Sequence, residues 1–75
     1  MNRDGLLVYL EGVYPDVHKG VVTLSREDGT KVLLPKDATA YLDEHPEGAD
    51  RGGYVPYVEL PNGSSVFFHE ELGWT

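Results

Sequence analysis

Three histidines each stand within two residues of a carboxylate, a pattern from which a metal site could be built. Imidazole nitrogen and carboxylate oxygen are ligands that zinc and other divalent ions use, provided that the fold brings two or three such pairs together. The alternative is three solvated histidines in an acid-rich chain, and we favour it, so no metal ligand and no cofactor is predicted. The pairs are Asp16 with His18, Asp43 with His45, and His69 with Glu70.

Paired carboxylates for general acid–base catalysis are the second chemistry to consider. Glu70 and Glu71 are adjacent, and adjacent residues of a strand point to opposite faces of a sheet, so they do not form a pair. Asp43, Glu44 and Glu47 could cluster on a helical turn, but an exposed, unpaired cluster does not make a general acid. The chain has no cysteine and no phosphate-binding glycine loop, HExxH or GxSxG motif. We therefore predict a protein that is not an enzyme.

Aromatic and acidic residues in the C-terminal half point to binding instead. In extended strands, Tyr57, Glu59 and Phe67 share one face of a sheet. Aromatic rings edged by carboxylates suit Lys or Arg side chains, through cation–π contact and charge. The alternative is a small closed barrel that buries parts of both faces, which would make the rings core. The residues predicted to contact a partner are Tyr57, Phe67, Glu59, Glu70, Glu71, Tyr9 and Glu11.

The charge of the chain is −7 and is unevenly distributed. Residues 1–42 carry six acids and five bases, a net charge of −1, whereas residues 43–75 carry seven acids and one base, a net charge of −6. Binding to a phosphate backbone needs Lys and Arg to displace counterions, so no direct nucleic-acid binding is expected. The acid could serve solubility alone. It would also attract a protein with a basic surface, as an adaptor or as an inhibitor that mimics nucleic-acid charge.

A hairpin over residues 55–68 must position the aromatic set. The run Leu60-Pro61-Asn62-Gly63 has the residues of a type I turn closed by a glycine in the left-handed region. This turn predicts two opposite faces of paired residues, Val58 with Val66 and Pro56 with Phe68 on the packing side, Tyr57 with Phe67 and Glu59 with Ser65 on the other. Because Pro56 cannot donate to a ladder, its strand is expected at a sheet edge, or with Pro56 where the partner bond is absent.

A second hairpin is predicted over residues 21–35, and residues 21–34 align without gaps to residues 55–68. Glu27-Asp28-Gly29 has the form of the same turn, which pairs Arg26 with Thr30. A duplication is one explanation. We favour the other, that two hairpins of one turn class need the same residue types.

The remaining elements are a strand over residues 6–14, a short helical turn capped by Asp37 and stopped by Pro46, and a loop over residues 47–53. Trp74 is expected to fold back onto the core, because its large apolar surface is costly to expose.

The 75 residues therefore predict one mainly β domain, residues 1–75, with one short helical turn. We expect a small five-stranded SH3-like barrel or a bent antiparallel sheet built from two hairpins. The order of elements resembles SH3-type and Tudor-type barrels, a likeness of pattern alone. The N-terminal apolar run is too short for a membrane span, and with no cysteine we expect a cytoplasmic protein. A structural subunit that forms a homo-dimer through a sheet edge or the aromatic face is the alternative function.

Overall fold

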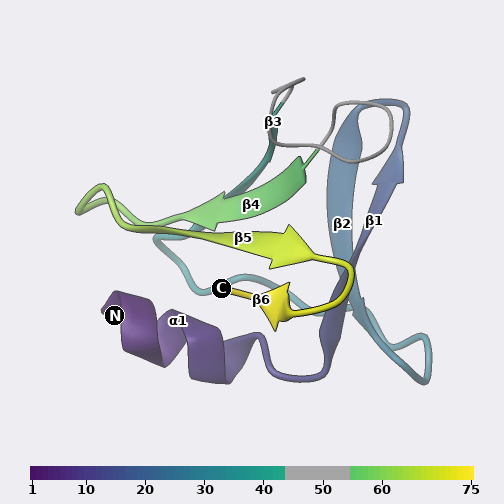
Figure 1. The fold of residues 1–75 in the computed structure, drawn as a ribbon, viewed down its shortest axis with the longest axis horizontal. Coiled ribbons are helices and arrows are strands. Elements are labelled where there is room, and N and C mark those ends of the chain that lie inside the picture. The colour runs from purple at the N-terminus through teal and green to yellow at the C-terminus, as the bar shows by residue number, and fades with distance from the viewer. Residues whose placement is uncertain (44–54) are drawn as a thin grey trace.

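The computed structural model describes residues 1–43 and 55–75, which form one short helix and six strands. The predicted loop over residues 47–53 lies outside the described residues. The elements are α1 (Arg3–Tyr9), β1 (Val13–His18), β2 (Val21–Arg26), β3 (Thr39–Asp43), β4 (Val55–Glu59), β5 (Ser65–His69) and β6 (Gly73–Trp74). The strands make two antiparallel sheets, β1–β2 and β3–β4–β5–β6 (Figure 1). The mainly β prediction is confirmed, but the described strands do not close into an SH3-like barrel.

The N-terminal segment is a helix, so the strand predicted over residues 6–14 is wrong. Asn2 caps the helix, because its side-chain oxygen accepts a hydrogen bond from the Gly5 N–H at 2.8 Å. The spacing of Leu6 and Leu10 places both on one helical face, and both side chains are fully buried. In a run this short, the same leucines fit a strand period and a helix period. The cap and the core decide between them.

Strands β1 and β2 form a hairpin that the sequence reasoning missed. They pair from Val13 with Arg26 to His18 with Val21. Lys19 and Gly20 have φ angles of 53° and 79°, as the two-residue type I′ turn requires. This turn makes residues 16–20 the end of a hairpin. Strand β2 therefore pairs along its full length with β1, the strand that precedes it in the chain.

The turn at Glu27-Asp28-Gly29 forms as predicted, although the strand after it does not. The Arg26 N–H donates to the Thr30 carbonyl at 2.8 Å, and the Val32 N–H donates to the Leu24 carbonyl at 2.9 Å. The two arms form an isolated bridge, Ser25 with Lys31, rather than a longer ladder. Val32 and Leu34 then pack against the hydrophobic core. The predicted register is confirmed, whereas the predicted hairpin over residues 21–35 is not complete.

Strand β3 lies where a helical turn after Asp37 was predicted, so that prediction is wrong. A turn ends at Ala38, whose N–H donates to the Pro35 carbonyl at 3.0 Å. From there the chain is extended and pairs with β4, from Thr39 with Glu59 to Asp43 with Val55. Alternation then places Ala40 against the core and Tyr41 on the opposite face. The ladder to β4, a long-range contact, overrides the local helical preference. Pro46, the predicted stop, lies outside the described residues.

The hairpin of β4 and β5 has the predicted register, with Tyr57 opposite Phe67, Val58 opposite Val66 and Glu59 opposite Ser65. Its turn is closed by the Leu60 N–H, which donates to the Ser64 carbonyl at 2.8 Å.

Strand β4 lies between β3 and β5, so the edge position predicted from Pro56 is wrong. Hydrogen-bonded pairs alternate along an antiparallel ladder. Since Leu60 bonds to Ser64, the next such positions toward β5 are Val58 and then Pro56. The ladder to β5 ends at Tyr57 with Phe67, one pair before the N–H of Pro56 would be needed. The missing N–H of Pro56 therefore falls at the end of the ladder. This agrees with the other prediction for Pro56, that it lies where the partner bond is absent.

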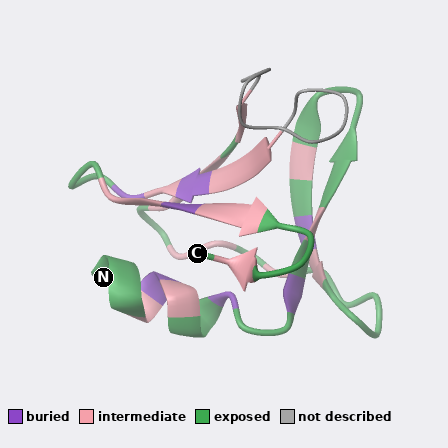
Figure 2. Ribbon diagram, in the orientation of Figure 1, coloured by how far each residue is buried: buried purple, intermediate pink, exposed green. Residues whose placement is uncertain are grey.

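The core lies between α1 and the two sheets. Figure 2 shows buried segments on α1, at the start of β1, within β2 and on β4 and β5 near their turn. Trp74 folds back as predicted: it pairs with Phe68, and its Nε1–H donates to the Val13 carbonyl at 2.8 Å. No helix among the described residues is long and apolar enough to cross a membrane. The buried residues are Leu6, Leu10, Val13, Leu24, Val58, Leu60 and Val66.

Candidate binding face on the four-stranded sheet

The four-stranded sheet has one face against the core and one face turned away from it, which we call the outer face. Val58 and Val66 are fully buried and mark the core side, so their strand neighbours point outward. Strands β3, β4 and β5 bring these outward positions together through their register. The residues of the outer face on these strands are Thr39, Tyr41, Asp43, Val55, Tyr57, Glu59, Ser65, Phe67 and His69.

Three aromatic rings form a continuous stack across the outer face. The ring centroids of Tyr41 and Tyr57 are 5.3 Å apart with an interplanar angle of 26°. Those of Tyr57 and Phe67 are 4.9 Å apart at 24°. The three residues lie directly opposite one another on β3, β4 and β5, so the ladder itself aligns the rings. Such pairs stabilise a protein by about 0.5–1.5 kcal/mol each beyond the area they bury. We call these three residues the aromatic stack.

The aromatic stack is accessible at its β3 end. Tyr41 is 43% exposed, while Tyr57 and Phe67 are half-buried. Sequence reasoning identified Tyr57 and Phe67 but missed Tyr41, because it placed Tyr41 on a helical turn. The signal that could have found it is the alternation of Thr39, Ala40, Tyr41 and Leu42, which fits a strand with one polar and one apolar face.

Two carboxylates border the aromatic stack. Asp43 follows Tyr41 by two positions on β3, and Glu59 follows Tyr57 by two positions on β4, so both lie on the outer face. Burial raises the pKa of the Tyr57 hydroxyl above its ordinary value of 10.0, and the charges of Glu59 and Asp43 raise it further. The rings therefore lie in a negative electrostatic field. None of the outer-face residues named above is a Lys or an Arg.

The other four predicted contact residues do not join the aromatic stack. Tyr9 is at the end of α1 and Glu11 is in the following turn, so neither lies on the strand that was predicted over residues 6–14. The Tyr9 hydroxyl donates to the Leu33 carbonyl, and α1 packs on the core side of the sheet. Glu70 and Glu71 lie in the exposed turn between β5 and β6. That any of these four residues contacts a partner stays a prediction.

A second aromatic group packs on the core side of the same sheet. The ring of Phe68 meets Tyr14 edge-on at 6.4 Å and 76°, and meets Trp74 at 5.2 Å and 67°. We call these three residues the aromatic corner. Trp74 is anchored there by its bond to Val13, so this group joins β1 to β5 and β6. It closes the fold and offers a natural control for experiments on the aromatic stack.

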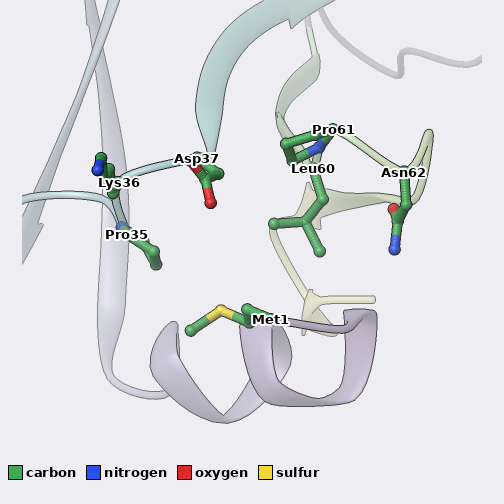
Figure 3. Close-up of a pocket in the computed structure, with 7 residues that line it drawn as sticks. All are labelled: Met1, Pro35, Lys36, Asp37, Leu60, Pro61 and Asn62. Carbon is green, nitrogen blue, oxygen red and sulfur yellow. The ribbon is translucent and has the colours of Figure 1, made fainter.

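A shallow pocket of about 270 Å³ lies between the N-terminus and the turn after β4 (Figure 3). This volume is just below the range of roughly 300–1,000 Å³ for ligand sites. In Figure 3 the side chains of Lys36 and Asn62 lie at opposite ends of the view, so the polar groups do not converge on one point. We assign no chemistry to it. The lining residues are Met1, Pro35, Lys36, Asp37, Leu60, Pro61 and Asn62.

The histidines are separated in the part of the chain that the structure describes. His18 ends β1 beside its turn, whereas His69 ends β5. Within residues 1–43 and 55–75, no three His, Cys, Asp or Glu side chains come together in a way that could hold a metal ion. His45, Glu44 and Glu47 lie outside those residues, so the Asp43–His45 pair and the predicted acidic cluster are not described.

Comparisons with protein-family models, with curated proteins and with solved structures found no match to this chain. What it does must therefore be argued from the aromatic stack, the two carboxylates and the charge of the chain.

Proposed function

We propose that this chain is a non-catalytic acidic module of the cytoplasm that binds a basic surface of a protein partner through its outer face. One observation carries the proposal: the aromatic stack is accessible at Tyr41 and is bordered by Asp43 and Glu59. Rings supply contact area at a low cost in side-chain entropy, and carboxylates select for cationic groups.

Long-range charge supports the same function. A net charge of −7 attracts basic surfaces from a distance and speeds association at low ionic strength. A protein that binds nucleic acid offers such a surface. By covering it, this chain would act as an inhibitor that imitates phosphate charge; by covering a basic protein segment, it would act as an adaptor.

A titration with a defined basic peptide tests the proposal. The probe is a soluble peptide of alternating lysine and arginine, and heat of binding is the readout. Glu59→Gln is expected to weaken binding by about two- to fivefold, the range for one exposed ion pair. Glu27→Gln removes the same charge from the turn after β2 and is the matched control. Equal losses in the two variants would show that net charge alone attracts the peptide, and the outer face would then be the wrong site.

Self-association through the same face is the second candidate, because the accessible ring of Tyr41 could also stack on a second copy. The bordering carboxylates of two copies would repel each other in that arrangement. We therefore expect light scattering to report a monomer of 8.3 kDa at high protein concentration. A dimer that dissociates in the variant Tyr41→Ser would make self-association the better supported function.

A further inference from the structure

We propose that the outer face selects arginine over lysine, with the guanidinium group of the partner docked against Tyr41 and paired with Asp43. This inference rests on the proposed function and names the chemistry that the partner must present. It is carried by the order of the rings in the aromatic stack and by the position of Asp43 beside the accessible end.

The three rings are not equivalent as docking points. Tyr57 is the middle ring, and its neighbours Tyr41 and Phe67 stack against it from both sides. Tyr41 ends the stack on β3 and is 43% exposed. A planar group can add to such a stack at an end ring and not at the middle one, where the neighbouring rings already occupy both faces.

The carboxylates distinguish the two ends. At the Tyr41 end, Asp43 stands two residues along the same strand face, about 7 Å away at the rise of an extended chain. At the Phe67 end, the corresponding position two residues along holds His69 instead of an acid. Tyrosine with a carboxylate beside it binds a cation, so the Tyr41 end is the docking point.

Guanidinium fits this end better than ammonium for two physical reasons. It is planar, so it can lie on a ring while its N–H groups reach a carboxylate in the same plane. It is also more weakly hydrated, so it loses less hydration free energy when it docks on the partly exposed ring of Tyr41. A lysine ammonium keeps its hydration shell and is attracted mainly by the net negative charge of the protein.

Two peptides of equal length and charge test the selectivity, one of arginine alone and one of lysine alone. With the unchanged protein, we expect the arginine peptide to bind about threefold tighter, the ratio typical of one exposed cation–π contact. Tyr41→Leu is expected to abolish the preference while the affinity for the lysine peptide stays the same. Tyr41→Phe keeps a ring and should keep the preference. Asp43→Asn should weaken binding of both peptides, and of the arginine peptide more.

Tyr14→Leu is the matched control, because it removes an exposed ring from the aromatic corner instead. Amide chemical shifts of the unchanged protein provide a measurement that needs no variant, and those of Tyr41 and Asp43 are expected to move most with the arginine peptide. Equal affinity for both peptides, or shifts centred away from β3, overturns the arginine preference and leaves the proposed function standing. If neither peptide binds, both proposals fail. A preference that survives in Tyr41→Leu assigns the selectivity to another residue and overturns the inference.

Discussion

Two turns of this chain have nearly the same structure and lead to different outcomes. At Asp28-Gly29 and at Asn62-Gly63, the glycines have φ angles of 90° and 89°. The side chain before each glycine accepts a hydrogen bond from a backbone N–H two positions later. The Thr30 N–H donates to Asp28 Oδ1 at 2.9 Å, and the Ser64 N–H donates to Asn62 Oδ1 at 2.8 Å. After the second turn the chain forms β5, whereas after the first it makes one bridge and leaves the sheet.

The difference lies in what each arm meets in space. Strand β2 pairs with β1 along its full length, and the residues after Lys31 turn Val32 and Leu34 toward the core. Strand β5 pairs with β4 on one side and with β6 on the other. A turn motif thus decides where the chain reverses and in which register. The length of the hairpin depends on what the arm after the turn packs against, another strand for β5 and the core for Val32 and Leu34.

The largest expected effect separates the two arms at the core. Val66→Ala is expected to lower the free energy of unfolding by about 2 kcal/mol, because a fully buried valine loses two methyl groups and leaves a cavity. The aligned variant Val32→Ala is expected to cost less than about 1 kcal/mol, because Val32 is only half-buried. Urea unfolding of both variants measures the difference. Equal costs would mean that the first arm is as much a part of the core as β5.

A middle effect tests whether the turns themselves are equivalent. Gly29→Ala and Gly63→Ala each force an L side chain into the left-handed region and are expected to cost about 1 kcal/mol each. No atom lies within 4 Å of a Cβ built at either position, so backbone strain is the only expected cost. Thermal melts of the two variants should therefore shift by similar amounts. A much larger shift for Gly63→Ala would show that the full hairpin amplifies the strain of its turn.

The smallest effect uses a difference in charge between the turns, Asp28 against Asn62. The side chain and the N–H of Thr30 hold the pKa of Asp28 below its ordinary value of 3.8. A carboxyl with a lowered pKa in the folded state stabilises the fold above pH 3.8, and this contribution is lost as pH falls through the folded pKa. Asp28→Asn should make the stability of the fold less sensitive to acid, because it removes this carboxyl. Asn62→Asp should make the stability more sensitive to acid, because it adds one. The midpoint of acid unfolding measures both, and an unchanged midpoint in both variants would refute the linkage.

Much of the aromatic site could be predicted from the sequence, because a turn signal sets register and register assigns faces. Tyr57, Phe67 and Glu59 were placed together from Leu60-Pro61-Asn62-Gly63 alone. Tyr41 and Asp43 could not be placed in the same way. Their strand depends on pairing with β4 across residues 44–54, a connection too long for a tight turn to set the register, and a predicted local helical turn competed with it.

The N-terminal segment was predicted as a strand, because its local pattern fits two kinds of secondary structure. Leu6 and Leu10 are spaced by four, which suits a helix, but with Val8 between them they also alternate as in a strand. The Asn2 cap favours the helix, and burial against Val58 and Val66 completes it. Tyr9 and Glu11 were assigned to a strand for this reason alone.

From the sequence alone follow the turns at Asp28-Gly29 and Asn62-Gly63, the register of the hairpin that carries Tyr57 and Phe67, and the acidic charge of the chain. These properties depend on residues close together in the chain, whose backbone preferences and charges act at short range. The folded structure was needed to show that β2 pairs with β1, that β3 lies beside β4, and that Tyr41 ends the aromatic stack. The pairing of β2 with β1 is local in the chain, whereas β3 meets β4 across residues 44–54, and in both cases burial of apolar surface selects among several locally permitted alternatives.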